Sequence, residues 1–567
     1  MQVINRIKEE LNSYQNGTVE VTAGYTFSAS KLIRRILLYK NEIYPTGKRD
    51  SQGNYKYWFN IISPRVDSEV KNIDFDSKDI LLVSDAQEDS GKLLIANARM
   101  KEYMREKGEA AKLNEAVERG TEWGNIIWKK VKDGYKILEL DKVFVLNQTA
   151  ETLEDSDVIE YEIMSPLDMR KKVGVWNNVE ELIELSTGKK EVTKTAPEFF
   201  VYERNGEITT KEFAETQGGD GGDDKTYMLA KVIVGGIEKD APTQLLFAEK
   251  ITKKEYKEYH RGKYSGRWLR TGMYELLFDT QTRANEIGNQ IARGLEWSSK
   301  TIFRSSDPVI AQNILTDMQN GDIIKSKDLQ QVVTRMDGFD QLMADWNRIM
   351  DIADKLANSF EVVTGESLPS GTPFRLAERL NINANKLFDF IREKLGIAFQ
   401  DVVEDWILPD LIKDLKTMTV LKLTADSQYL SRYFVMIVDA WYLNNLLSLP
   451  PHPPEIGIAL KQAKVQELLE NKEVVVKLEK EMWADFAPRV FVVITGEQVN
   501  LASELETLKN FAALEADPVR RTALIELAMK KKGIDIDKLP KSPPQQMQPP
   551  EQAPQQKQSR ETIGTPT

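Results

Sequence analysis

Two strongly amphipathic segments of similar length constrain this 567-residue chain most. Apolar residues recur at three- and four-residue spacing through residues 272–297 and again through residues 341–363, which predicts two long helices. At 1.5 Å per residue, each helix would be roughly 35–40 Å long. Residues 298–340, between them, carry short apolar runs and predict a small insert of strands and a short helix. An ordinary helical hairpin with an inserted subdomain has the same periodicity, so that interpretation stays open.

A break and a third long helix follow. Residues 364–372 read TGESLPSGT, in which glycines near both ends and a proline between them oppose continuous helix. Thr372 as N-cap and Pro373 at the first helical position then predict a new helix start. Its apolar positions continue to Trp406, and Pro409 is expected to end or kink it.

The N-terminal half predicts mostly short strands instead of long helices. A helix is expected over residues 27–40 and helical structure over residues 93–120. The remainder, up to about residue 250, predicts short strands at residues 58–62, 80–83, 125–128, 135–138, 143–146, 198–202 and 231–234. The tetrapeptide KDGY at residues 132–135 predicts a hairpin turn between two of these strands. The fold class is therefore α+β.

The C-terminal part returns to helical periodicity. Residues 455–483 predict helix and residues 489–495 a strand. A helical pair is expected over residues 501–516 and 518–533. Residues 541–567 are rich in Pro and Gln and almost without apolar residues, which predicts a disordered tail.

Few residues are available for catalysis or metal binding. The chain has no Cys and only two His, so disulfides and thiolate sites are excluded and His-based zinc sites or triads have little to draw on. The phosphate-cradling pattern GxxxxGK[ST] is absent. The segment GESLP at residues 365–369 departs from the nucleophile elbow GxSxG, because proline replaces the second glycine. We expect no catalytic residues, no cofactor and no metal.

The net charge of the chain argues against tight binding of duplex DNA. The net charge is −11, whereas proteins that hold DNA by its phosphates are usually basic. Residues 253–270 form a local exception, with seven Lys or Arg against two Glu and four interleaved aromatic residues. Contact with DNA or a neighbouring subunit is one interpretation and a solvated hairpin is the other. The candidates are Arg261, Lys263, Arg267 and Trp268.

No membrane attachment is expected. Residues 1–16 are charged throughout and lack the apolar run of a signal peptide. Residues 433–449 form the most apolar stretch, which is too short and too polar to span a bilayer. The chain is therefore expected to be soluble and to stay in the compartment where it is made.

The order of these elements resembles the portal proteins of tailed bacteriophages, and GESLPSGTPFRLAERL at residues 365–380 is typical of that family. The resemblance implies a strand-rich wing, a two-helix stem, a small mixed clip, a long wing helix and a helical crown. Its divisions are wing 1–271, stem helices 272–297 and 341–363, clip 298–340, tunnel loop 364–372, long helix and rest of the wing 373–500, crown 501–540 and tail 541–567.

The resemblance also implies a structural function with no catalysed reaction. Members form rings, usually dodecamers, at one capsid vertex, through which double-stranded DNA is packaged and ejected. The implied partners are further copies of the chain, the major capsid protein, the terminase and head-completion adaptor or tail proteins. The implied location is the virion, after assembly in the bacterial cytoplasm. A metal-dependent nucleic-acid-processing enzyme of a phage is the alternative, and another phage structural subunit is a third.

Two sets of residues are implied to act in the ring. The stem stripe is too long for one helix partner, so we expect it to contact both its own hairpin partner and a neighbouring subunit through Trp346, Ile349, Met350 and Ala353. The tunnel loop is implied to face the DNA with Gly365, Glu366, Ser367, Leu368, Pro369, Ser370 and Gly371.

Overall fold

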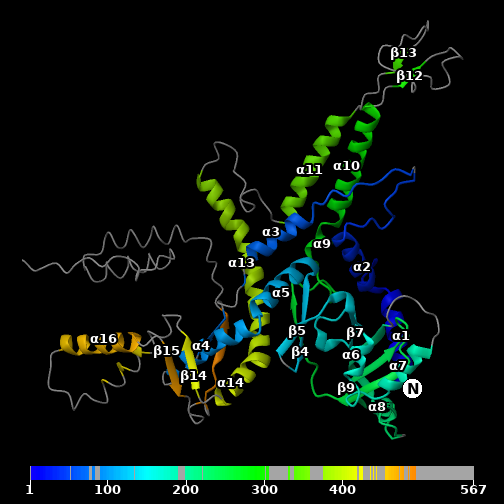
Figure 1. The fold of residues 1–567 in the computed structure, drawn as a ribbon. Helices are drawn as coiled ribbons and strands as arrows, with labels where there is room; N and C mark the ends of the chain where they lie inside the picture. Colours follow the sequence, from blue (N-terminus) through cyan, green and yellow to red (C-terminus); the bar gives the residue numbers. More distant parts are fainter. Residues whose placement is uncertain are drawn as a thin grey trace, which may run out of the picture. The chain divides into compact units, whose positions relative to one another are not determined.

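The chain is an α+β protein in which helices connect several small antiparallel sheets, as the computed structural model shows (Figure 1). The chain divides into residues 1–495 and residues 496–567, and every described residue belongs to the first unit. The structure describes residues 2–51, 53–73, 75, 80–83, 90–132, 134–188, 198–219, 221–299, 302–304, 330–332, 338–357, 374–417, 420–424, 434–435, 438–439, 442, 454–470, 473–477, 483 and 486–492.

The largest sheet is a five-stranded meander in which each strand pairs with the next along the chain. Its strands are β6 (Val143–Val145), β7 (Val158–Met164), β8 (Phe199–Thr209), β9 (Tyr227–Gly236) and β10 (Gln244–Lys250). The alternation within β9 separates two cores, as expected for a strand buried on both faces. Val232 and Val234 belong to the main core, whereas Ile233 belongs to a smaller core.

Helices cover both faces of this meander. The main core lies beneath the apolar faces of α1 (Gln2–Asn16) and α2 (Ala29–Lys40). The smaller core includes residues of α6 (Pro166–Arg170) and α7 (Val179–Gly188). The remaining elements of this part are β1 (Val19–Thr22), β2 (Tyr25–Phe27), the short helices Leu140–Lys142 and Leu153–Asp155, and α8 (Thr210–Thr216).

A separate core lies against a three-stranded sheet, two of whose strands also contribute residues to the main core. Its strands are β4 (Asn125–Val131), β5 (Gly134–Ile137) and β11 (Tyr256–His260), in the order β11-β4-β5. Helices α3 (Ser63–Ile73), α4 (Ser90–Glu106), α5 (Glu109–Trp123) and α13 (Phe374–Val402) contribute to this core. Phe399 of α13 lies 6.0–6.1 Å, ring centre to ring centre, from Phe75, Trp128 and Tyr135. The long helix is therefore anchored on the sheet.

The predicted helical hairpin is present with altered ends. The stretch expected as one helix over residues 272–297 is two helices, α9 (Met273–Leu276) and α10 (Phe278–Ser299), because Leu277 leaves helical geometry at φ −104° and ψ 6°. The returning helix, α11 (Phe339–Ala357), runs beside α10 (Figure 1). The strands β12 (Ile302–Arg304) and β13 (Gln330–Val332) pair at the far end of the hairpin.

The strand expected at residues 58–62 is extended but joins no sheet. A row of amide side chains on α10 replaces the missing strand: Asn289, Asn285 and Gln281 accept the N–H groups of Tyr57, Phe59 and Ile61 at 2.8, 2.8 and 3.0 Å. Four helical residues rise about 6 Å and two extended residues about 6.6 Å, so the two repeats match. We call this row the amide ladder.

Gly288 lets the extended segment lie close to α10, since a Cβ at this position would stand 2.4 Å from the ring of Phe59. Gln281 and Asn289 also donate to the carbonyl oxygens of Phe59 and Tyr57, at 2.6 and 2.9 Å. The ladder therefore satisfies both polar groups of the facing backbone.

Replacing Gln281 by methionine should lower the free energy of unfolding by about 1–3 kcal/mol, because the buried N–H of Ile61 loses its acceptor. Urea unfolding measures the loss. The matched control is Gln290→Met, an exposed position on the same helix, where a change within about 0.5 kcal/mol is expected. Equal losses in the two variants would show that the ladder adds nothing to stability.

Two further expectations are met only in part. Pro409, expected to end or kink the long helix, does not end it: a π turn at Val403–Ile407 precedes it, and α14 (Leu408–Thr417) continues. The wider turn changes the hydrogen-bond pattern where proline has no N–H to donate. Helix over residues 455–483 stops at Glu470 in α16 (Pro454–Glu470). The β-branched run at residues 474–476 forms β15 (Glu473–Lys477) instead, paired with β14 (Val420–Thr424).

The last described strand joins distant parts of the chain. The strand expected at residues 489–495 is β16 (Arg489–Val492), which pairs antiparallel with β3 (Ile80–Val83). The strands expected at residues 80–83, 125–128, 135–138, 143–146, 198–202 and 231–234 are confirmed as β3, β4, β5, β6, β8 and β9. The hairpin turn expected at residues 132–135 joins β4 to β5.

Candidate functional site: the helical hairpin and its base

The apolar stripe of α11 packs on its own protomer. Ala353 is buried, and Trp346, Ile349 and Met350 are half-buried against the main core. The Trp346 ring meets Phe59 edge-on at 5.6 Å between ring centres. These residues therefore join the hairpin to the segment that the amide ladder holds.

Ion pairs fix the hairpin at two heights. Arg65 of α3 lies 2.6 Å from Asp354 and donates to the carbonyl oxygen of Met350 at 3.4 Å. Further along the hairpin, Arg283 of α10 lies 2.7 Å from Asp345 of α11. Because α10 and α11 are antiparallel, this second pair shows which residues of the two helices lie at the same height.

A buried ion pair ties the basic segment to α3. Arg261 follows β11 and donates from Nε and Nη2 to the two carboxylate oxygens of Glu69, both at 3.0 Å. Glu69 is completely buried. Burial raises the pKa of Glu69 above its ordinary value, and the Arg261 guanidinium opposes part of that rise. Arg261 therefore neutralises a buried charge.

Arg267 and Trp268 also have partners inside the protomer. Arg267 lies 2.7 Å from Glu275, and its guanidinium is 4.8 Å from the centre of the Phe27 ring. Trp268 is buried and donates from Nε1 to Glu258 at 2.8 Å. Lys263 is the exposed member of the four candidates. Sequence pattern could not identify Glu69 as the partner of Arg261, because the two residues are 192 positions apart, whereas Glu258 lies inside the basic segment and Glu275 just beyond its end.

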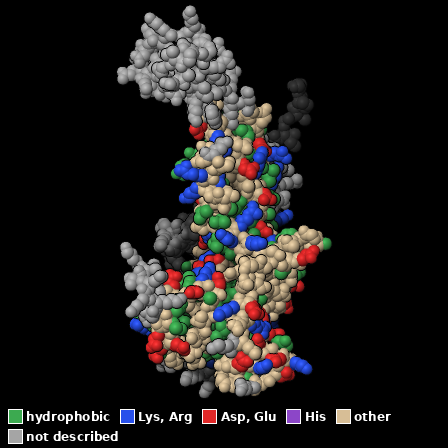
Figure 2. Space-filling model, turned by 90° about the vertical axis from the view of Figure 1, so that its right-hand side faces the viewer, with side chains coloured by type: hydrophobic (Ala, Val, Ile, Leu, Met, Phe, Trp, Pro, Cys, Tyr) green, Lys and Arg blue, Asp and Glu red, His purple; other side chains and the backbone are tan. Residues whose placement is uncertain are grey.

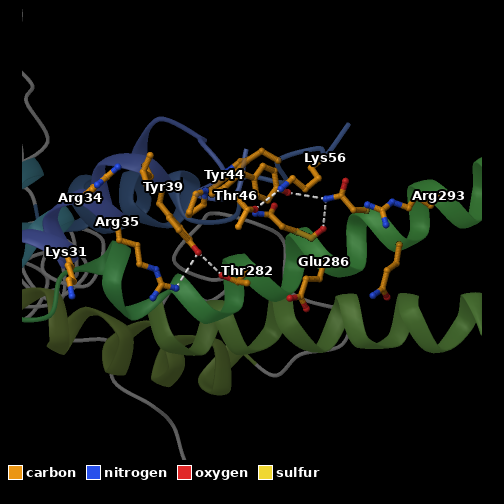
Figure 3. A pocket seen from close by; sticks show the side chains of 16 residues that line it. Lys31, Arg34, Arg35, Tyr39, Tyr44, Thr46, Lys56, Thr282, Glu286 and Arg293 are labelled. Atoms are coloured by element: carbon orange, nitrogen blue, oxygen red, sulfur yellow. Dashed lines mark hydrogen bonds between the residues drawn. The ribbon is translucent and has the colours of Figure 1, made fainter. Parts of the chain in front are cut away.

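A groove of about 770 Å³, which the sequence did not suggest, lies along the base of α10 (Figure 3). Its wall includes the aromatic side chains of Tyr39, Tyr44 and Trp58. Its cations come from α2, from the segment before the ladder and from α10: Lys31, Arg34, Arg35, Lys56 and Arg293. Glu286 is the acidic residue among those that line it. Three segments that are separate in the sequence supply these charges, so no local sequence motif predicts the groove.

The charge pattern of the surface is mixed. Figure 2 shows Lys and Arg side chains interspersed with Asp and Glu along the hairpin and below it. No group of three or more His, Cys, Asp or Glu that could hold a metal ion occurs among the residues in the described ranges. None of the helices described above has both the length and the apolar character needed to cross a membrane.

Several predicted parts lie outside the described residues. They are the tunnel loop 364–372, the end of the second stem helix at residues 358–363, most of the clip, the crown 501–540 and the tail 541–567. The predicted roles of Glu366 and its neighbours therefore stay predictions.

Comparison of the chain with protein-family models and with curated proteins gives no match.

Proposed function

We propose that this chain is the subunit of a ring-shaped portal through which double-stranded DNA enters and leaves a phage capsid. The observation that carries the proposal is the helical hairpin α10–α11, which has a small two-stranded insert at its far end and is followed by a long helix anchored in a second core. That order of elements matches the stem, clip and wing helix of the family that the sequence resembles. The proposed role is passage and anchorage, with no reaction catalysed.

The surface of the hairpin exposes apolar side chains. Met343 and Leu356 of α11 are 37% and 38% exposed, and Leu295 of α10 is 52% exposed. These three apolar side chains stand at separate heights of the hairpin and form no single patch. A second copy would cover them in a ring.

The acidic balance of the chain suits a channel through which DNA slides. Each phosphate contact adds affinity, so a channel with many of them would hold the DNA in place. A subunit with net charge −11 limits such contacts. In this proposal the clip binds the terminase motor and later the head-completion adaptor or tail proteins. The wing meets the major capsid protein at one vertex of the virion.

The test is the assembly state of the purified protein. We expect a closed ring, usually of twelve copies, in native mass measurements and in negative-stain images viewed along the axis. A monomer or dimer that cleaves nucleic acid only with a divalent metal would overturn the proposal in favour of a metal-dependent enzyme.

The tunnel loop provides a functional test of the same proposal. Replacing residues 366–370 by a Gly/Ser linker should leave ring and capsid assembly unchanged while reducing DNA packaging or retention, because Glu366 and the apolar Leu368 and Pro369 would no longer meet the DNA. Packaged DNA per capsid and its release over time are the measurements. Full packaging and stable retention would show that the loop is only a connector.

A further inference from the structure

The groove beside α10 carries more positive charge than the protomer itself neutralises. Of the side chains that line it, five are cations and one, Glu286, is an anion. Glu286 already lies 3.2 Å from Arg283, and Arg293 is paired with Asp50. Three of the lining cations have no carboxylate oxygen within 4.0 Å among the residues that the structure describes: Lys31, Arg34 and Lys56. These side chains are available to an anion from outside the protomer.

The cations of α2 are crowded on one face of that helix. Lys31, Arg34 and Arg35 are exposed and three or four positions apart, so they are neighbours on the helix surface. Like charges at this spacing destabilise a helix, and Lys31 in the first turn also opposes the helix dipole. Arg35 lies 4.0 Å from Asp279, but that carboxylate is fully exposed and solvent screens the pair. An external anion would relieve this repulsion.

The cations stand at the two ends of the groove, as Figure 3 shows. At one end, the guanidinium of Arg35 is 4.2 Å from the centre of the Phe278 ring. At the other end, Lys56 is 4.6 Å from the centre of the Tyr44 ring, whose hydroxyl accepts a hydrogen bond from Asn289. Residues 278 and 289 are about 16 Å apart along the helix. An extended peptide covers that distance with about five residues.

The aromatic wall of the groove favours a peptide over a nucleic acid. Trp58 meets Tyr39 and Tyr44 edge-on, at 5.3 and 5.1 Å between ring centres and at interplanar angles of 87° and 72°. Successive bases stack on a row of ring faces, and the edge-on contacts interrupt such a row. Tyr, Trp and Arg are the residues that contribute most to binding at protein interfaces. The lining therefore combines the side chains of a protein-binding site with an excess of positive charge.

We infer that this groove binds an extended acidic segment of a partner protein. Its carboxylates pair with the cations of α2 at one end and with Lys56 at the other, about five positions apart along the segment. Apolar side chains between the carboxylates pack against Tyr44 and Trp58. Charge complementarity selects this class of partner, because the groove is cationic on a chain whose net charge is −11. The inference goes beyond the proposed ring and does not depend on it.

The experiment selects random displayed peptides of about twelve residues, more than twice the length that covers the groove. The targets are the full chain and its double variant Arg34→Glu with Lys56→Glu. We expect the wild type to enrich peptides with Asp or Glu about five positions apart and apolar residues between them, and the variant to enrich none of these. In titration calorimetry, the best peptide should bind the variant at least about tenfold more weakly, because like charges then face each other.

The matched control is Lys225→Glu with Lys263→Glu, which changes the net charge equally at exposed positions outside the groove and should leave peptide binding unchanged. Thermal unfolding of each variant identifies any that do not fold. Should the charge reversals prevent folding, Arg34→Gln with Lys56→Gln takes their place with the same expected loss of binding.

Peptides that bind the folded groove variant as well as the wild type, or enriched peptides without acidic residues, would overturn the inference. Equal loss of binding in the control would assign the effect to net charge and would also overturn it. A single-stranded oligothymidylate that binds through the same cations, where acidic peptides do not, would assign the groove to nucleic acid instead. The assembly state of the chain decides the portal proposal separately, so either proposal can fail while the other stands.

Discussion

Replacing Arg261 by alanine is expected to lower the free energy of unfolding at pH 7 by about 3–5 kcal/mol, the usual cost of leaving a buried charge without its partner. The buried carboxylate of Glu69 receives two hydrogen bonds from this guanidinium. Chemical denaturation at several pH values measures the loss. An exposed basic segment engaged only with solvent would lose less than about 0.5 kcal/mol.

The loss should shrink as the pH falls. Burial already raises the pKa of Glu69, and removing Arg261 takes away the charge that lowers it, so the pKa of Glu69 rises further in the variant. A carboxyl group with a raised folded-state pKa binds protons more readily in the folded protein. Its stability contribution is present at low pH and is lost as the pH rises through that pKa. The variant should therefore lie closest to the wild type below the ordinary pKa of a glutamate and fall furthest below it above the raised folded-state pKa of Glu69.

The matched control removes both charges. Glu69→Leu with Arg261→Leu leaves no unpaired ion, so this double variant should lose less stability than Arg261→Ala alone and should show a weaker pH dependence. A double variant that is less stable than the single one at every pH would contradict the assignment of the loss to the unpaired carboxylate.

Trp346→Asp is expected to have the second large effect. The indole packs against Phe59 and the main core, so an aspartate there loses this contact and places a charge against apolar side chains. A loss of roughly 2–4 kcal/mol in the free energy of unfolding is expected for a half-buried site. In the proposed ring the change should also prevent assembly, because the hairpin would lose its fixed position on the base.

Two controls separate the causes. Trp346→Phe retains an aromatic ring facing Phe59 and should keep most of the stability and the assembly. Asn347→Asp adds the same charge at the next, exposed position of α11 and should leave stability within about 0.5 kcal/mol of the wild type. A Trp346→Asp protein as stable as wild type would show that the stripe does not anchor the hairpin. A variant that still forms full rings would contradict its predicted role in assembly.

Sequence periodicity predicted where helices and strands lie along the chain better than it predicted which segments they contact. The two hairpin helices could be predicted because apolar residues recur at three- and four-residue spacing over most of the length of each helix. The segment at residues 58–62 shows the limit. Its pattern predicted a strand, but no strand forms there, and the groups that pair with its backbone are amides of α10 more than 200 residues away. A single sequence offers no local signal for such a pairing.

The charged residues show the same limit. Residues 253–270 look like one basic surface in sequence, yet Arg261 and Arg267 are paired inside the protomer and Trp268 is buried. Lys254 of the same segment is also buried and donates to the carbonyl oxygens of Leu153, Glu154 and Ser156. The cationic groove was missed for the opposite reason, because its charges are scattered in sequence and converge only in the fold.

The pairing of β3 with β16 has a consequence for synthesis on the ribosome. More than 400 residues separate Val83 from Arg489, so at 5–20 residues per second the nascent chain carries the apolar run ILLV for roughly 20–80 s before its partner emerges. An unpaired apolar strand is a template for pairing with other chains. Slow translation or a crowded polysome should therefore favour aggregation of this chain at residues 80–83, and chaperone demand should end only when residue 492 has left the exit tunnel.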